Sequence, residues 1–358
     1  MTAALDATPL TLTSGGLARY VSELSLALAR GYPDDKYLLL SDRKFALPAG
    51  APANLVAGTD SPCDKRWWLR GVRRAIAQSG TQVFHGTNFE VPYLGNTPAI
   101  LTIHDLSPWG DPAWHAGADR VRRRTPWLIR MRRARLILTV SQAVRREILT
   151  HFSLSEDRVR AIPLAASGLF RPMVCHAPHR KPYFLFVGTL EPRKNLPALV
   201  DAWQATRFET GADLLIAGRT RADFVPIPPM EGIQYLGEVS DDELPCLFSG
   251  ALAFVYPTLY EGFGLPVLEA MQCGCPVITS RDPAVTEVSG GAAIHATSVT
   301  EIADAMRAVA ANPERRRELR EKGLTRARHF SWSATARATR ALYQEVLNRD
   351  VLNREVLT

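Results

Sequence analysis

The chain has 358 residues, of which 46% are hydrophobic and 22% are charged. That length indicates two domains of comparable size, and that composition excludes wholesale disorder. No run approaches 18 uninterrupted apolar residues, so the sequence predicts no membrane-spanning helix. The start, as far as Asp6, lacks the basic segment of a secretion signal, and we therefore expect a cytoplasmic protein.

The net charge of +7 is confined to the first half of the chain. Residues 1–170 hold 22 Lys and Arg against 14 Asp and Glu, whereas residues 171–358 hold 21 against 22. The basic excess is densest between Arg120 and Arg146. Such a surface attracts phosphate groups, in nucleic acid, anionic lipid or a pyrophosphate-linked substrate. The alternative is that these arginines form only a solvated helix face.

Cysteine usage is sparse. Five cysteines form neither a disulfide framework nor two paired CxxC motifs: Cys63, Cys175, Cys246, Cys273 and Cys275. This pattern fits a reducing cytoplasm. Cys273 and Cys275 stand at the entry to an apolar run, so we expect small buried thiols there.

Short apolar runs alternate with segments of helical spacing along the chain. We expect buried strands at 97–103, 135–140, 183–188, 213–218, 252–257 and 275–280, and helices at 195–205, 241–249 and 264–272. This alternation predicts the α/β class, with parallel sheets that carry helices on both faces. Because the pattern occurs once in each half, we expect two doubly wound domains.

Proline and glycine concentrate at 163–182 and mark the boundary between the halves. We therefore expect a first domain of residues 1–167 and a second domain of residues 168–340. The tail, 341–358, has apolar residues at helical spacing and is expected to form a last helix.

Two segments of the first half carry residues suited to a substrate site. Gly15 and Gly16 precede an apolar-periodic helix, and paired glycines let a ligand approach the amides at a helix start. His104 follows the strand 97–103 and can contact a substrate hydroxyl, with Asp105 orienting the ring or capping a turn. The alternative for Gly15 and Gly16 is a plain loop, and the alternative for His104 is a structural role. His85 can likewise be either a substrate-binding or a structural histidine.

Arg193, Lys194 and Asn195 follow the strand 183–188, and open α/β sheets bind ligands at such strand ends. Arginine offers a planar fork to phosphate oxygens and lysine offers a point charge, so the pair suits a diphosphate. Asn195 can cap the next helix. The alternative is an ordinary loop with solvated charges.

The strongest chemical signal is the segment Glu261-Gly-Phe-Gly-Leu-Pro-Val-Leu-Glu269. Gly262 and Gly264 allow a tight turn, and Pro266 suits the first turn of a helix. The amides at the start of that helix suit a diphosphate, and the two flanking carboxylates can accept hydrogen bonds from sugar and ribose hydroxyls. The alternative is that two unrelated glutamates happen to lie beside a loop–helix junction. That alternative would not account for the Gly-Phe-Gly-Leu-Pro sequence between them.

Motifs of several other enzyme classes are absent from the sequence. It has no Asp-x-Asp, which would clamp a metal on a sugar nucleotide, and no HExxH, Walker A or GxSxG motif. We therefore expect neither a metal nor a cofactor.

Taken together, the segments resemble a retaining glycosyltransferase of family 4 (glycosyl transferases group 1), which has the GT-B fold. The resemblance covers almost the whole chain and is carried, in order and spacing, by SGGLARYV, TIHDLSPW, TVSQAV, VGTLEPRKN, YLGEVSDDELP and YPTLYEGFGLPVLEAMQCGCPVITS. It implies two Rossmann-like domains facing across a cleft, the first binding the acceptor and the second the nucleotide sugar. The last helix would cross back onto the first domain.

The resemblance also implies roles for the matching residues. Arg193 and Lys194 would hold the donor diphosphate, Glu261 the hydroxyls of the donor sugar and Glu269 the ribose. His104 would line the sugar pocket and would join Glu261, Arg193 and Lys194 as the catalytic set. The backbone of the helix start would surround the sugar, and two glycines of the first domain would lie near the phosphates: Gly262, Phe263, Gly264 and Leu265, and Gly15 and Gly16.

The implied chemistry needs no metal. Departure of the leaving group puts negative charge on the diphosphate, which the two cations and the helix amides can stabilise. The family's expected route is a same-face substitution through an oxocarbenium-like state. The EGFGLP and IHDLSPW segments look like those of polysaccharide mannosyl- and rhamnosyltransferases, so we expect GDP-mannose as donor, with a UDP- or dTDP-sugar as the alternative. The acceptor would be a glycan or lipid-linked glycan, and the stretch 120–146 would then touch the inner membrane surface.

Three other function classes compete with this interpretation. A nucleotide-sugar epimerase of GT-B shape would need no acceptor, but it is not expected to carry the EGFGLPVLE loop. A nucleic-acid-binding protein is suggested only by the pI of about 9.3, and the aromatic residues stand mostly in expected strands rather than among basic residues. An inactive scaffold would not account for two carboxylates and two phosphate-facing cations.

Overall fold

In the computed structural model the chain divides into two compact units. The first unit comprises Met1–Leu164 and Ser331–Thr358, and the second comprises Ala165–Phe330. The sequence placed these boundaries at 167 and 340, so both observed boundaries lie earlier in the chain. The structure describes residues 1–11, 15–58, 66–114, 117–175, 179–222, 224, 225 and 227–355, with the backbone alone for 350–355. Ser14 of the first motif, Cys63 and the end of the expected last helix lie outside these residues.

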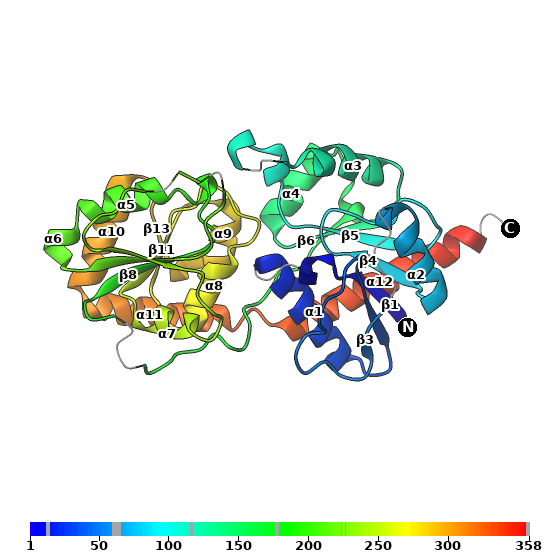
Figure 1. The fold of residues 1–358 in the computed structure, drawn as a ribbon, viewed down its shortest axis with the longest axis horizontal. Helices are drawn as coiled ribbons and strands as arrows, with labels where there is room; N and C mark the ends of the chain where they lie inside the picture. Colours follow the sequence, from blue (N-terminus) through cyan, green and yellow to red (C-terminus); the bar gives the residue numbers. More distant parts are fainter. Residues whose placement is uncertain are drawn as a thin grey trace. The chain divides into compact units, whose positions relative to one another are not determined.

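The first unit is built on a seven-stranded parallel sheet with the strand order β3-β2-β1-β4-β5-β6-β7 (Figure 1). Its strands are β1 (Thr2–Asp6), β2 (Lys36–Leu40), β3 (Leu55–Ala57), β4 (Val83–Gly86), β5 (Ala99–Ile103), β6 (Leu136–Thr139) and β7 (Val159–Ala161). Its helices are α1 (Gly16–Gly31), α2 (Val72–Ser79), α3 (Asp119–Arg130), α4 (Gln142–His151) and α12 (Trp332–Glu355). Short turns of helix are η1 (Thr8–Thr11), η2 (Trp67–Gly71), η3 (Ser107–Trp109), η4 (Pro112–Trp114) and η5 (Glu156–Arg158).

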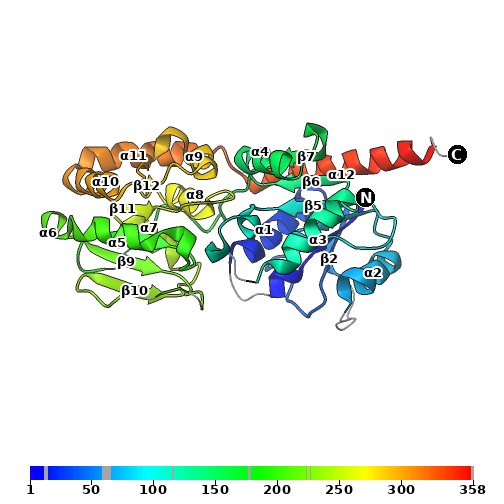
Figure 2. The ribbon, with the colours of Figure 1, turned by 90° about the horizontal axis from the view of Figure 1, so that it is seen from above.

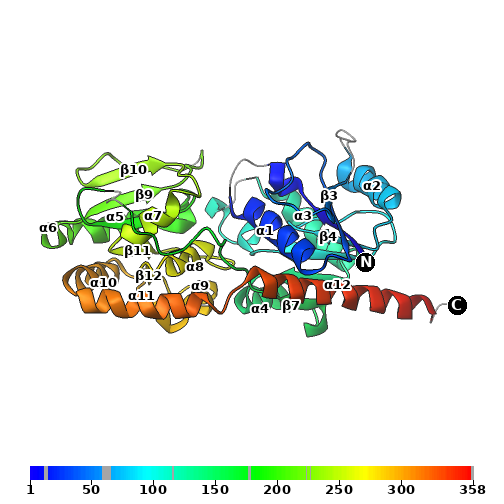
Figure 3. The same ribbon diagram turned by 90° about the horizontal axis from the view of Figure 1, so that it is seen from below.

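The last helix, α12, belongs to the first unit and runs along α1 (Figure 3). It begins at Trp332 rather than at the expected residue 341, because the Ser331 side chain caps it by accepting a hydrogen bond from Ala334 N (3.2 Å). Apolar spacing from 341 onward revealed the helix but not this cap. Beyond its apolar face, α12 is anchored by an ion pair between Arg340 and Asp35 (2.6 Å).

His85 joins α12 to the sheet and has a structural role. Its Nδ1 forms a hydrogen bond with the Tyr343 hydroxyl of α12 (2.7 Å), and its Nε2 forms one with Thr102 Oγ1 of β5 (2.6 Å). Burial lowers the pKa of His85 to about 3, so the ring stays neutral. The structural alternative weighed for His85 is therefore confirmed.

The second unit is built on a six-stranded parallel sheet with the order β10-β9-β8-β11-β12-β13, and β10 lies at its edge (Figure 2). Its strands are β8 (Tyr183–Val187), β9 (Asp213–Ala217), β10 (Ile233–Gly237), β11 (Ala253–Tyr256), β12 (Val277–Thr279) and β13 (Ile294–His295). Its helices are α5 (Leu196–Gln204), α6 (Arg207–Thr210), α7 (Leu244–Gly250), α8 (Leu265–Gln272), α9 (Pro283–Ser289), α10 (Val299–Ala311) and α11 (Pro313–Ala327). The short turns of helix are η6 (Pro192–Lys194) and η7 (Gly290–Ala292).

Both sheets are doubly wound, as the alternation of strands and helices predicts. In the second unit α10 packs on α5 and α6, while α11 and α7 pack on α8. Strand order reverses between β1 and β4 in the first unit and between β8 and β11 in the second. Right-handed crossovers then place successive helices on opposite faces, and the reversal opens a crevice at the carboxyl ends of the strands. The expected α/β class and its Rossmann-like topology are confirmed.

Close packing of two loops shapes the carboxyl end of the second sheet. Gly218, after β9, has a φ of +139°, and a Cβ there would lie 1.9 Å from the carbonyl oxygen of Gly188. Only glycine allows this approach. It lets the loop after β8 pair with the loop after β9 through Leu190 and Thr220, and so fixes the start of the segment that carries Arg193.

The cysteines differ in part from expectation. Cys175 and Cys246 form a disulfide, which joins the segment before β8 to α7. The two residues are 71 positions apart, and a spacing of that length gives no sign in the sequence that they meet. Cys273 and Cys275 are buried free thiols as expected, and burial raises the pKa of both.

Among the described residues, no helix combines the length and the apolar character that crossing a membrane requires.

Candidate active site

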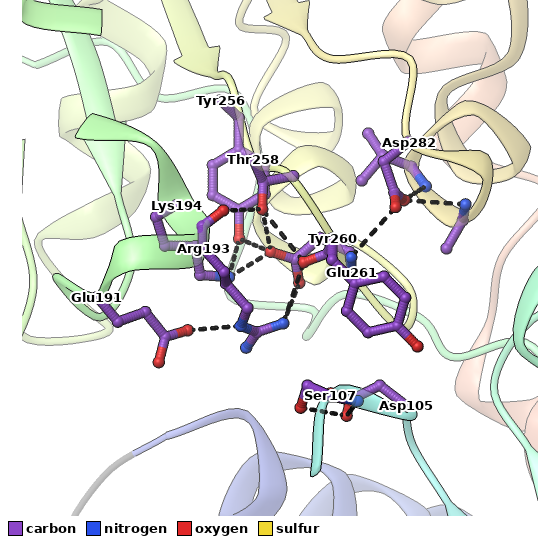
Figure 4. Close-up of polar contacts among 12 residues, drawn as sticks. Asp105, Ser107, Glu191, Arg193, Lys194, Tyr256, Thr258, Tyr260, Glu261 and Asp282 are labelled. Atoms are coloured by element: carbon purple, nitrogen blue, oxygen red, sulfur yellow. Dashed lines mark hydrogen bonds and ion pairs between the residues drawn. The ribbon is translucent and has the colours of Figure 1, made fainter. Parts of the chain in front are cut away.

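The carboxyl ends of β8 and β11 bring three of the expected site residues together (Figure 4). Arg193 and Lys194 lie in η6, the turn of helix that follows β8, and Glu261 lies in the loop that follows β11. These strands are neighbours at the point where strand order reverses, so two motifs far apart in the sequence meet at one crevice. All three side chains are largely buried.

The three charged side chains form a connected cluster (Figure 4). Lys194 Nζ donates a hydrogen bond to Glu261 Oε1, and Arg193 Nη1 lies 3.6 Å from Glu261 Oε2. The guanidinium of Arg193 is held on its other side by Glu191 Oε1, which accepts from Nε (2.7 Å), and by the carbonyl of Tyr260 (3.1 Å). The alternative of solvated loop charges is therefore wrong for this pair.

Burial and charge compete at Glu261. Burial alone would raise the pKa of this carboxyl, but the charges of Lys194 and Arg193 lower it to about 2. The pKa of Lys194 is lowered by burial and by the charge of Arg193, while Glu261 opposes that shift. Lys194 and Arg193 consequently flank an ionised Glu261 carboxylate.

Further side chains complete the cluster. Tyr256 and Thr258 stand in the YPTLYEGFGLP segment without a predicted role, and Asp282 lies beyond that segment. The hydroxyls of Tyr256 and Thr258 donate to Glu261 Oε1 (2.9 and 2.8 Å). Asp282 caps α9 and accepts a hydrogen bond from the backbone amide of Glu261 (3.3 Å). Burial raises the pKa of Asp282 to about 6. One signal would have found these residues, namely their position at the carboxyl ends of β11 and β12, the edge where ligands bind.

The EGFGLPVLE segment folds as its residue types predict. Gly264, with a φ of +93°, occupies the N-cap position of α8, and Pro266 lies in its first turn. Phe263 is buried against Phe330, with ring centroids 5.9 Å apart. Glu269 lies on α8 and is 2% exposed, whereas Glu261 precedes the helix. Asn195 does begin α5, but its side chain makes no capping hydrogen bond because its backbone is left-handed (φ 54°), so that expectation is wrong.

In the first unit, His104 lies at the end of β5 and is held in one tautomer. Its Nε2 donates to the carbonyl oxygen of Thr87 (2.8 Å), and a carbonyl can only accept. Burial lowers the pKa of His104. A neutral ring with its proton on Nε2 keeps a lone pair on Nδ1, so Nδ1 can accept a hydrogen bond from a hydroxyl group. Asp105 caps the turn after β5 by accepting from Ser107 N (2.9 Å).

Gly15 and Gly16 begin α1 as expected. Gly15 is its N-cap with a φ of 121°, and a Cβ on either glycine would meet nothing within 4 Å. The same helix carries Tyr20, whose ring packs edge-on against the His104 ring at 4.8 Å between centroids. The two expected regions of the first unit are thus linked through α1.

The arginines of 120–146 have divided roles. Several hold the fold together: Arg120 binds Glu90 (2.7 Å), Arg133 binds the carbonyl of Gly95 (2.5 Å), and Arg145 binds that of Val159 (3.1 Å). Others lie on the exposed face of α3 and the turn after it, namely Arg123, Arg130 and Arg132. The alternative that the whole stretch forms only a solvated helix face is therefore wrong for Arg120, Arg133 and Arg145.

Comparison with known proteins agrees with this arrangement. Residues 175–326 match the family Glycosyl transferases group 1, and residues 14–166 match Glycosyltransferase Family 4. O-antigen chain mannosyltransferase B of Escherichia coli is 36% identical over 292 residues, which cover 76% of this chain and 74% of that protein. O-antigen chain mannosyltransferase RfbU of Salmonella typhimurium is 27% identical, over 64% of each chain.

The fold has solved counterparts. Sucrose-phosphate synthase of Thermosynechococcus elongatus superposes with a TM-score of 0.73 at 19% identity, over 97% of this chain and 99% of that one. The architecture is therefore the GT-B fold. From its sequence, its two doubly wound units and its matches over both halves, the chain belongs to glycosyltransferase family 4 and is a glycosyltransferase.

Proposed function

We propose that this chain transfers a mannosyl residue, with retention of configuration, from GDP-mannose to a hydroxyl group of a glycan or lipid-linked glycan during synthesis of a cell-surface polysaccharide. The observation that carries the proposal is the cluster of Arg193, Lys194 and Glu261 at the crevice of the second sheet. The choice of mannose is supported by the mannosyltransferases among the relatives of this chain.

The cluster suits departure of a nucleoside diphosphate. When the bond to the sugar breaks, negative charge develops on the diphosphate, and preorganised cations stabilise it. Arg193 and Lys194 supply that charge, and the amides at the start of α8 can add to it. The carboxylate of Glu261 is ionised and can accept hydrogen bonds from the donor sugar. In the first unit, neutral His104 can accept a hydrogen bond from a hydroxyl group at Nδ1.

A thermal-shift panel of GDP-, UDP- and dTDP-sugars tests the donor. A ligand that binds only the folded state raises its stability by RT ln(1+[L]/Kd), so the tightest donor gives the largest increase in Tm. We expect GDP-mannose to give that increase and to be turned over in an acceptor assay. A larger shift with a UDP- or dTDP-sugar would contradict the choice of base, and turnover without acceptor would favour the epimerase.

We expect activity to be independent of divalent metal ions. The cations that face the leaving group come from the chain itself, and the sequence has no Asp-x-Asp clamp. Initial rates in excess EDTA should equal those in magnesium or manganese. Activity that disappears in EDTA and returns with either metal would overturn this expectation.

We also propose that the first unit contacts anionic membranes through the exposed face of α3. Arg123 and Arg130 are seven positions apart and so share one face of the helix. Trp127 and Met131, between and beside them, are 45% and 57% exposed. A face that combines arginine with an exposed aromatic ring suits the headgroup region of an anionic bilayer.

Liposome co-sedimentation tests this contact. Each arginine near an anionic surface contributes about 1 kcal/mol, so Arg123→Gln combined with Arg130→Gln should weaken partitioning by about tenfold or more. Arg315→Gln combined with Arg317→Gln serves as the control and should change nothing, since both side chains lie on the solvent side of α11 in the second unit. Liposome binding that does not weaken as the salt concentration rises would contradict the proposal. Equal binding by the two double variants would also contradict it.

A further inference from the structure

Tyr256 is the last residue of β11 and is 1% exposed. Its ring stacks on Phe186 of β8, with centroids 5.8 Å apart and 27° between the planes, and on Phe254, at 5.3 Å and 26°. Packing against two roughly parallel rings restrains the orientation of the Tyr256 ring. The ring position thus sets where the hydroxyl group lies, whatever the hydroxyl itself contacts.

The hydroxyl lies between the two charges of the cluster (Figure 4). It is 2.6 Å from Lys194 Nζ and 2.9 Å from Glu261 Oε1. An ammonium group can only donate and an ionised carboxylate can only accept, so the hydroxyl accepts from Lys194 and donates to Glu261. Burial, together with the charge of Glu261, raises the pKa of Tyr256 well above its ordinary value, which keeps the proton on the hydroxyl.

The two carboxylate oxygens of Glu261 have different surroundings. Oε1 accepts from three groups: Lys194 Nζ, the Tyr256 hydroxyl and the Thr258 hydroxyl. Oε2 lies 3.6 Å from Arg193 Nη1. The last torsion of a glutamate is broad and soft, so only contacts of this kind hold the carboxylate plane in one orientation.

We propose that Tyr256 is a positioning residue of the transfer reaction: its hydroxyl ties Lys194 to Glu261 Oε1, and this turns Oε2 toward the donor sugar. The inference rests on the proposed function, since it takes the donor sugar as the partner of Glu261. The sequence motifs predict no role for the Tyr256 hydroxyl. In this proposal Tyr256 does not contact the substrate, and it acts only through Glu261 and Lys194.

The substitution Tyr256→Phe separates the hydroxyl from the ring. Phenylalanine keeps the stacking on Phe186 and Phe254, while the carboxylate of Glu261 loses one of its three donors and turns more freely. Because hydrogen bonds to a charged group are among the stronger ones, we expect kcat to fall about tenfold or more, with less than a threefold change in the donor KM.

A double-mutant cycle shows whether the effect passes through Glu261. We expect Tyr256→Phe to lower kcat in the wild-type background and to have little effect, within about twofold, once Glu261→Gln is present. Tyr183→Phe is the matched control, because Tyr183 is a buried tyrosine of β8 whose hydroxyl donates to the carbonyl of Leu247 (2.8 Å). It should leave kcat unchanged, and its effect should be additive with Glu261→Gln.

Unfolding free energies of the same proteins provide a readout that needs no substrate. The cycle between Tyr256→Phe and Glu261→Gln should show coupling in stability, and the cycle with Tyr183→Phe should show none. Additive kinetic effects at Tyr256, or a Tyr256→Phe variant as active as Tyr183→Phe, would overturn the proposal. If GDP-mannose is not turned over, the proposed donor is wrong, and the kinetic cycle is run with the nucleotide sugar that the panel identifies.

Discussion

Lys194→Ala is expected to lower kcat/KM for the donor about 30- to 1,000-fold, since the loss of one preorganised group facing a developing anion costs roughly 2–4 kcal/mol. The side chain is 7% exposed and lies against Glu261, so no solvent cation can replace it readily. Arg193→Ala should also weaken donor use, because it removes the second cation of the cluster. Steady-state kinetics with varied donor at saturating acceptor measures both effects. Near-wild-type kinetics in both variants would mean that neither cation faces the diphosphate.

The same Lys194→Ala substitution should destabilise the fold. Removing one partner of a buried ion pair costs about 3–5 kcal/mol, because the charge that remains loses its nearest compensation. Without Lys194, the cationic partner that the carboxylate of Glu261 keeps among the described residues is Arg193, at 3.6 Å. Lys322→Ala is a suitable control, since Lys322 and Glu318 form an exposed pair on α11 that contributes about 0.3–0.5 kcal/mol. Denaturant unfolding should therefore distinguish the two substitutions clearly.

The pH dependence of that destabilisation follows from the pKa of Glu261. In the native protein this pKa is about 2, below its usual value, so the ionised carboxylate contributes stability at neutral pH that is lost as the pH falls toward 2. Without Lys194 the pKa rises, and protonation relieves the buried charge. The difference in unfolding free energy between wild type and variant should therefore be largest near neutral pH and shrink as the solution is acidified. A difference independent of pH would contradict this account.

The second large effect separates Glu261 from Glu269. A contact to the reacting sugar can strengthen in the transition state, whereas a contact to the ribose is remote from the bond that breaks and holds ground and transition states about equally. Loss of the first kind of contact lowers kcat, and loss of the second raises KM. Glu261→Gln should therefore mainly reduce turnover, and Glu269→Gln should mainly raise the donor KM.

Kinetics with varied donor at saturating acceptor decides between the two roles. The amide keeps the shape of the side chain, and thermal unfolding of each variant checks that the fold is retained. If both substitutions change only KM, or if Glu269→Gln alone abolishes kcat, the assignment of the two carboxylates is wrong.

Much of the fold could be predicted because its signals are local. Each strand expected from an apolar run is present, and the helix that begins at Leu265 follows from Gly264 and Pro266. The meeting of Arg193 with Glu261 could also be anticipated, because both stand at the ends of parallel strands and such ends share one edge of a sheet.

The rest depends on contacts that no local pattern encodes. Tyr256 resembles an ordinary strand residue in the sequence, and its hydroxyl gains a role only when Lys194 is folded against it. Asp282 stands 21 positions beyond the glutamate whose amide it binds. The disulfide between Cys175 and Cys246 likewise depends on where a connecting segment comes to lie.

The return of α12 to the first unit has a consequence for the order of events during protein synthesis. Domains generally fold as units while the chain emerges from the ribosome, and the N-terminal one usually completes first. Here the first unit needs residues from both ends of the chain, whereas Ala165–Phe330 is contiguous. Until α12 has been synthesised, the helix face of α1 that it covers stays open, and His85 lacks the hydroxyl of Tyr343. The second unit can thus reach its native packing earlier than the first, which reverses the usual sequence.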